Sequence, residues 1–133
     1  MLVPLPLSAR VDLPAEPASV GQARRFVRRV LDDWGLEGLV DTVQLLTSEL
    51  ATNAVLHART AFAVQVSRTD SEVRVDVLDG SRVHPRSRQA SLTAATGRGV
   101  NMVELLAERW GTTPETQLDG FAKGVYFTLP TSS

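Results

Sequence analysis

The order of apolar and polar positions predicts two long helices in the first half of the chain. Residues 19–34 repeat apolar side chains at helical spacing and stop at Gly35, a residue that suits a helix C-terminus. Ser19 and Gln22 have the spacing of a capping box, so we expect this helix to begin there. Residues 37–58 carry a second helical pattern. Its inner apolar stripe consists of Leu39, Val43, Leu46, Leu50 and Ala54.

The second half of the chain changes to the alternation that is typical of strands. Residues 60–68 and 72–79 both alternate, and the polar turn between them indicates a hairpin. Residues 79–97 have no periodicity, and a structureless segment of this length is usually functional or disordered. A third helix is expected at 98–111.

Both ends of the chain add strands to this plan. Residues 7–13 alternate inside a Pro-rich segment, 1–18, and predict an edge strand. Residues 108–115 and 120–130 predict one or two closing strands. The order indicates a single α+β domain over 1–133, a two-layer sandwich. We expect a mixed, mainly antiparallel sheet covered on one face by about three helices.

Composition excludes several classes of site and partner. The chain has no cysteine and two histidines, which rules out thiolate metal sites and leaves little material for zinc. The net charge is −1, so no global field attracts nucleic acid or a membrane surface. No apolar run approaches the roughly 20 residues that span a bilayer. We therefore expect a cytoplasmic protein that binds neither nucleic acid nor membrane directly.

Two polar residues interrupt the mostly apolar helix at 37–58. Glu49 and Asn53 fall on one flank of its inner stripe, about 40° apart on an ideal wheel. One interpretation is a solvated flank, or a Glu49 that caps a neighbouring loop. The other is the floor of a site where Glu49 handles a proton and Asn53 ligates a metal or a phosphate oxygen. An amide oxygen suits Mg²⁺, which completes its coordination with phosphates and water.

Two further segments have both a structural and a functional interpretation. Asp79 ends a core strand and precedes Gly80, which indicates either a turn or a buried acceptor for an exocyclic amine. Gly97 and Gly99 flank Arg98 just before the third helix. Backbone N–H groups at such a helix start form an anion site, although a plain loop-to-helix entry has the same composition.

Taken in order, these segments resemble the GHKL ATPases, the superfamily of gyrase B, the ninety-kilodalton heat-shock chaperone, histidine kinases and the MutL repair protein. "ELATNAVLHA" is similar to the N box, "DVLDGS" to the first glycine box and "TGRGVNMV" to the second. "AKGVYFTL" resembles the closing strand. Within the superfamily, the likeness is strongest to the compact bacterial anti-sigma factor serine/threonine kinases and related small ATP-binding regulators.

The resemblance implies the Bergerat ATP-binding fold, ATP and Mg²⁺ as cofactors, and a role for each matching residue. Glu49 would be the general base, and Asn53 would bind Mg²⁺. Asp79 would accept from the adenine amino group, with Thr128 near it. The residues that would cradle the phosphates are Gly97, Arg98 and Gly99, and 82–96 would form the ATP lid.

One departure keeps more than one function open. The first glycine box usually runs Asp-x-Gly-x-Gly, but Ser81 and Val83 stand where glycines are expected. The first hypothesis is a protein kinase that binds a sigma factor and phosphorylates an antagonist protein. The alternatives are a non-catalytic nucleotide-sensing module and the split catalytic half of a histidine kinase. The resemblance and the edge strand at 7–13 also suggest a homodimer.

Overall fold

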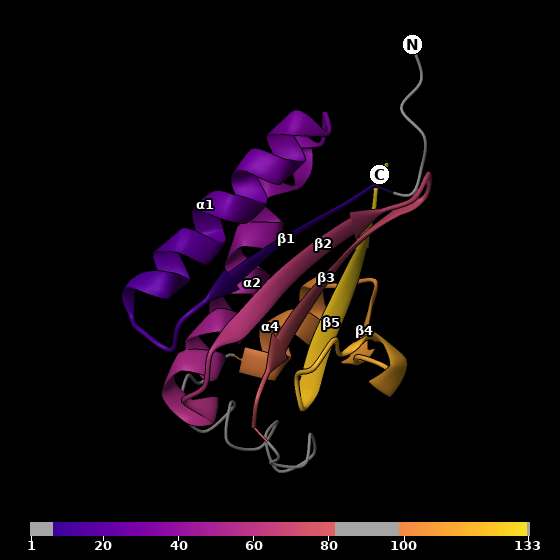
Figure 1. The fold of residues 1–133 in the computed structure, drawn as a ribbon. Coiled ribbons are helices and arrows are strands. Elements are labelled where there is room, and N and C mark those ends of the chain that lie inside the picture. The colour runs from indigo at the N-terminus through magenta and orange to yellow at the C-terminus, as the bar shows by residue number, and fades with distance from the viewer. Residues whose placement is uncertain (1–6, 82–98, 133) are drawn as a thin grey trace.

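The computed structural model describes residues 7–81 and 99–132, which form a five-stranded sheet with helices on one face (Figure 1). The strands are β1 (Leu7–Leu13), β2 (Phe62–Arg68), β3 (Glu72–Asp79), β4 (Arg109–Thr112) and β5 (Lys123–Pro130). The helices are α1 (Ala18–Asp33), α2 (Val40–Asn53) and α4 (Gly99–Leu106). Short helical turns lie at η1 (Glu37–Leu39), η2 (Ala54–Ala58) and η3 (Glu115–Gln117). The predicted α+β sandwich is confirmed.

The strands lie in the order β1-β2-β3-β5-β4, and all four described pairings are antiparallel, so the sheet is not mixed over the described strands. β1 pairs with β2 at one edge, as expected for 7–13. The hairpin between β2 and β3 is also confirmed. Thr69 closes its turn by donating its backbone N–H to the Glu72 carbonyl (2.9 Å) and accepting the Glu72 N–H at its hydroxyl (3.2 Å).

Alternation along the central strands gives the sheet one apolar and one polar face. Val73, Val75 and Val77 of β3 point toward the helices and are buried. They pack against the inner stripe of α2, of which Val43, Leu46, Leu50 and Ala54 are buried. Burying each valine or leucine of this set stabilises the fold by about 1.5–3 kcal/mol. The core therefore lies between the sheet and the helical layer.

The second predicted helix, 37–58, spans three kinds of helical turn. A 3₁₀ turn at η1 leads into α2, and a π turn at η2 ends the helix. In that π turn the N–H of Arg59 donates to the carbonyl of Ala54, five residues back (2.9 Å). Arg59 then adopts a left-handed conformation, with φ of 56°, which stops the helix.

Two sequence expectations are wrong in detail. The third helix ends at Leu106, because the Glu108 N–H donates to the Thr128 carbonyl (2.8 Å) and β4 begins at Arg109 along the edge of β5. The capping box at Ser19 does not form. The Ser19 hydroxyl instead donates to the Pro14 carbonyl (2.7 Å) and ties α1 to the end of β1.

Among the helices of residues 7–81 and 99–132, none combines the length and the apolar character that a membrane crossing requires.

Gly124 of β5 supplies a test of this packing. A Cβ atom there would overlap the Leu78 side chain and approach Thr113 Oγ1 to 2.6 Å. We expect Gly124→Ala to lower the free energy of unfolding by about 1–3 kcal/mol in urea denaturation, because the extra methyl overpacks the sheet. The control is Gly38→Ala, where nothing lies within 4 Å of the new atom. That change should be neutral or stabilise by up to about 1 kcal/mol. Equal effects from the two variants would contradict the packing described for β5.

Candidate functional site

The C-terminal half of α2, the end of β3 and the start of α4, which carry Glu49, Asn53, Asp79 and Gly99, lie toward one end of the sheet (Figure 1). α2 ends at Asn53 and the η2 turn ends at Ala58, and β2 begins only a few residues later, at Phe62. Phe62 is the strand partner of Asp79, the last residue of β3. The chain therefore brings the C-terminal end of α2 next to the C-terminal end of β3. α4 begins nearby and also packs against α2.

Glu49 and Asn53 lie on the buried side of α2. Glu49 is 7% exposed and Asn53 is completely buried, so the interpretation of this flank as solvated is wrong. The Asn53 Nδ2 group donates to the Glu49 carbonyl (2.8 Å), one helical turn earlier. Among the described residues, the Asn53 Oδ1 atom accepts no hydrogen bond. An unpaired buried acceptor usually costs about 1–3 kcal/mol, so this oxygen is available to a water or a bound cation.

The π turn at η2 starts at the residue after Asn53. Such turns are rare, and they occur frequently at functional sites because they shift side chains away from regular α-helical positions. Here the turn changes the direction of the chain directly beyond Asn53 and leads to Phe62 beside Asp79. The break in the helix is therefore part of what brings the two residues to the same end of the molecule.

Asp79 holds a buried ion pair rather than an open acceptor. Its Oδ1 atom accepts from Lys123 Nζ (3.0 Å) and from the Ser81 backbone N–H (2.9 Å). Asp79 and Lys123 are 2% and 7% exposed. Lys123 Nζ also donates to the Ser81 carbonyl (3.3 Å). Asp79, Ser81 and Lys123 thus form one hydrogen-bonded group at the end of β3.

Thr60 supports the turn that follows Asp79. The N–H of Gly80 donates to the Thr60 hydroxyl (2.8 Å), and a Cβ atom at position 80 would approach that threonine to 3.3 Å. Sequence reasoning missed both Thr60 and Lys123. A signal for Lys123 was present, because a strand that starts at 123 and pairs antiparallel with β3 faces the end of β3.

Thr128 does not lie beside Asp79, which corrects the sequence expectation. It pairs with Arg74, whereas Asp79 pairs with Lys123, five residues earlier on β5. Because side chains alternate along a strand, Thr128 also points to the opposite face of the sheet. The position next to Asp79 belongs to Lys123.

The structure describes only part of the segment that is predicted to bind phosphate. α4 begins at Gly99, which agrees with a helix start at that residue. Gly97, Arg98 and the proposed lid at 82–96 lie outside the described residues.

The residues fit a magnesium ion held mainly by a ligand's phosphates. Asn53 Oδ1 is a hard oxygen donor without a protein partner in the described part of the chain. Residues 7–81 and 99–132 contain no group of three or more His, Cys, Asp or Glu side chains that would hold a metal by themselves. Mg²⁺ commonly takes one or two protein oxygens and completes its shell with phosphate and water, which matches this donor set.

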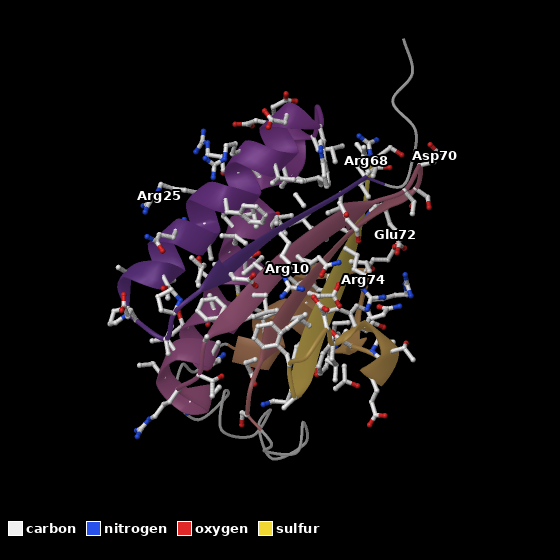
Figure 2. All side chains as sticks on the ribbon, in the orientation of Figure 1. Arg10, Arg25, Arg68, Asp70, Glu72 and Arg74 are labelled. Atoms are coloured by element: carbon white, nitrogen blue, oxygen red, sulfur yellow. The ribbon has the colours of Figure 1, made fainter. Side chains whose placement is uncertain are left out.

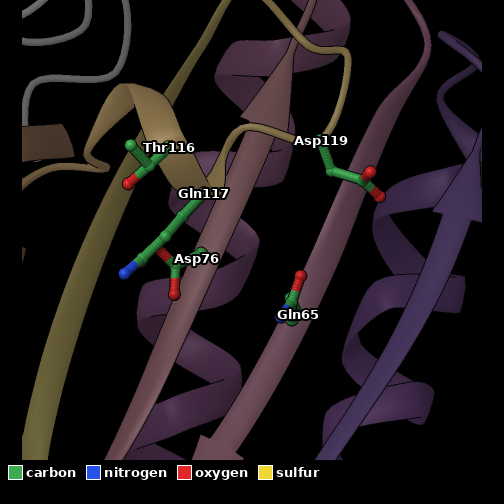
Figure 3. A pocket seen from close by; sticks show the side chains of 5 residues that line it. All are labelled: Gln65, Asp76, Thr116, Gln117 and Asp119. Carbon is green, nitrogen blue, oxygen red and sulfur yellow. The ribbon is translucent and has the colours of Figure 1, made fainter.

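A hollow of about 300 Å³ lies on the polar face of the sheet (Figure 3). Its lining residues are all polar: Gln65, Asp76, Thr116, Gln117 and Asp119. Arg74 pairs with Asp76, and Arg10 pairs with both Asp12 and Asp119. Figure 2 labels the two arginines. Burial lowers the pKa of Arg10, but its hydrogen bonds and charge pairing with Asp12 and Asp119 outweigh this and raise it. The paired charges make this hollow part of the sheet's own polar network.

A comparison with protein-family models identifies the family of the chain. Residues 13–117 match the histidine kinase-like ATPase domain. The chain belongs to this family. The predicted superfamily is thereby confirmed, and the chain is a kinase-like ATPase domain of an ATP-binding family. No curated protein matches it closely enough to serve as a relative. The narrower likeness to anti-sigma factor kinases stays a prediction.

The ion pair of this ATPase domain predicts a strong effect of Asp79→Ala on stability. This change removes the carboxylate that pairs with the buried ammonium of Lys123. Loss of one partner of a buried ion pair typically lowers the free energy of unfolding by about 3–5 kcal/mol. Urea denaturation near neutral pH measures the loss. Asp33→Ala removes an exposed carboxylate from the end of α1 and should change stability by no more than about 0.5 kcal/mol. If both variants unfolded at the same urea concentration, the pair would not contribute as described.

Proposed function

We propose that this ATPase domain is a Mg-ATP-dependent regulatory serine/threonine kinase of the anti-sigma factor type. It would bind a sigma factor and transfer the γ-phosphoryl group of ATP to a hydroxyl group of an antagonist protein. The observation that carries the proposal is the buried pair on α2: Glu49 one turn before Asn53, whose Oδ1 atom has no partner among the described residues.

Each candidate residue is proposed to contact a different part of the nucleotide. Asn53 would hold Mg²⁺ through Oδ1, and Asp79 would face the base at the end of β3. The resemblance of the second glycine box assigns the phosphates to Gly97, Arg98 and Gly99, of which the structure describes Gly99, the first residue of α4. When bound, Mg²⁺ neutralises charge on the phosphate oxygens. Phosphoryl transfer depends mostly on such positioning and charge neutralisation.

Glu49 is proposed as the general base. The acceptor hydroxyl oxygen attacks the γ-phosphorus, the bond from that phosphorus to the bridging oxygen of ADP breaks, and the hydroxyl proton passes to the Glu49 carboxylate. Glu49 lies on α2 one turn before Asn53, so the helix would fix its distance from a metal ion held by that amide.

The partners follow from the resemblance of the N box and the second glycine box to anti-sigma factor kinases. A mixture of the purified chain, a candidate sigma factor and a candidate antagonist protein from the same cell, with γ-labelled ATP, tests them. Label on a serine or threonine of the antagonist supports the proposal. Label on a histidine favours the catalytic half of a histidine kinase instead.

A second candidate is a nucleotide-sensing module without transferase activity. Two observations favour it: Ser81 replaces an expected glycine of the first glycine box, and Asp79 is engaged by Lys123. Partner binding that depends on ATP, with no phosphorylated product for any partner, would select this function.

Isothermal titration with Mg-ATP tests the metal role of Asn53. We expect Asn53→Ala to weaken Mg-ATP binding by about 10- to 100-fold, because one oxygen contact to a charged group is lost. ATP in excess EDTA should bind the variant and the wild type almost equally. An equal loss in both conditions would mean that Asn53 contributes to the fold rather than to the metal.

Glu49→Gln separates catalysis from binding. The amide keeps the size of the side chain but does not accept a proton, so we expect phosphoryl transfer to fall by about 10²- to 10⁴-fold. Mg-ATP affinity should change by less than about threefold. Glu37→Gln, on the exposed η1 turn, is the matched control and should transfer at the wild-type rate. Normal turnover by Glu49→Gln would exclude Glu49 as the base.

A further inference from the structure

Lys123 is the single lysine of a chain that has thirteen arginines, and it is buried at the proposed nucleotide site. Its strand register places it directly opposite Asp79, at the start of β5 and the end of β3. Its ammonium donates to Asp79 Oδ1 (3.0 Å) and to the Ser81 carbonyl (3.3 Å). Two strands therefore hold the cation against the carboxylate that the proposed function assigns to the base.

A purine amino group at this position and the Lys123 ammonium would both donate to the Asp79 carboxylate, whose Oδ1 atom already accepts from Lys123. The amino group is a neutral donor, whereas Lys123 is charged, and a charged donor forms the stronger bond with a carboxylate. A second Asp79 Oδ1 contact, from the Ser81 N–H at 2.9 Å, further occupies that oxygen. Reading the amino group through Asp79 would require displacing or sharing a buried ion pair.

We propose that Lys123 is a specificity-determining residue of the base subsite, where its contact with Asp79 cancels selection for the 6-amino group of adenine. The inference rests on the proposed nucleotide-binding function. A carboxylate without the lysine would favour a 6-amino purine and repel a 6-carbonyl oxygen. With the lysine in place, the subsite offers a donor as well as an acceptor, so both kinds of purine nucleotide are accommodated.

The test compares ATP with inosine triphosphate, which carries a carbonyl oxygen where ATP carries its 6-amino group. Titration calorimetry in Mg²⁺ gives both dissociation constants. We expect the wild type to bind the two nucleotides within about threefold of each other. Lys123→Thr removes the ammonium, and we expect it to bind ATP about 10- to 100-fold more tightly than inosine triphosphate.

Lys123→Arg is the matched control, because it keeps a cation and its donors opposite Asp79. It should retain the wild-type ratio of the two dissociation constants. A wild type that already prefers ATP by more than tenfold, with a ratio that Lys123→Thr leaves unchanged, would overturn the inference while leaving nucleotide binding intact. Absence of binding of either nucleotide to all three proteins would instead overturn the proposed function and this inference with it.

A measurement on the wild type keeps the inference testable if Lys123→Thr does not fold. Labelling with [¹⁵N]lysine marks one residue, so the side-chain ammonium gives a single nuclear magnetic resonance signal. We expect this signal to shift on addition of Mg-ATP and of Mg-inosine triphosphate, in different directions, because one base presents a donor and the other an acceptor. A signal that neither nucleotide moves would show that the base does not reach Lys123, which contradicts the proposal.

Discussion

The pairing of β3 with β5 is the contact on which the rest of the structure depends. β3 lies at the centre of the sheet, and its valines form the floor of the core beneath α2. The same register that buries Val75 opposite Phe127 places Asp79 opposite Lys123 at the end of the strand. A slip of one residue would turn the valines away from the helices and separate the ion pair. Core packing and the chemistry of the site are therefore fixed by one alignment of two strands.

A second constraint is that α2 both fills the core with apolar side chains and buries two polar ones. Its inner stripe is buried, and Glu49 and Asn53 are buried beside it. The hydrogen bond from Asn53 Nδ2 to the Glu49 carbonyl satisfies the donor half of the amide within the helix. Its oxygen remains as an acceptor that the described residues do not use. Such a half-satisfied amide is unfavourable in an empty core, and it becomes favourable when a cation or a water completes it.

Periodicity predicted most of the fold because the helices and the sheet each present one apolar face. The hairpin of β2 and β3, the edge strand β1 and the helical stretch at 37–58 all follow from local pattern. The end of α4 did not, because residues 107–110 continue an apolar helical repeat. Pairing of β4 with β5 overrides that repeat: it satisfies backbone groups along the edge of β5 and sets Trp110 opposite Phe127. The family motifs singled out Glu49, Asn53 and Asp79 as candidates, since each lies within a short signature.

The position beside Asp79 shows what local patterns leave out. Thr128 and Lys123 lie on the same strand, and the sequence favours the threonine because its hydroxyl resembles the family's partner for the aspartate. Only the register decides between them, and it selects the residue at the start of β5. A buried carboxylate requires a partner, and the closing strand supplies a full positive charge here rather than a hydroxyl. The site thus differs in charge from the pattern of its motifs, because the residue beside Asp79 is a lysine and not a threonine. The Asp79 carboxylate already has a hydrogen-bond partner there without any ligand. A base bound at Asp79 would therefore share the carboxylate with an ammonium that the fold itself provides.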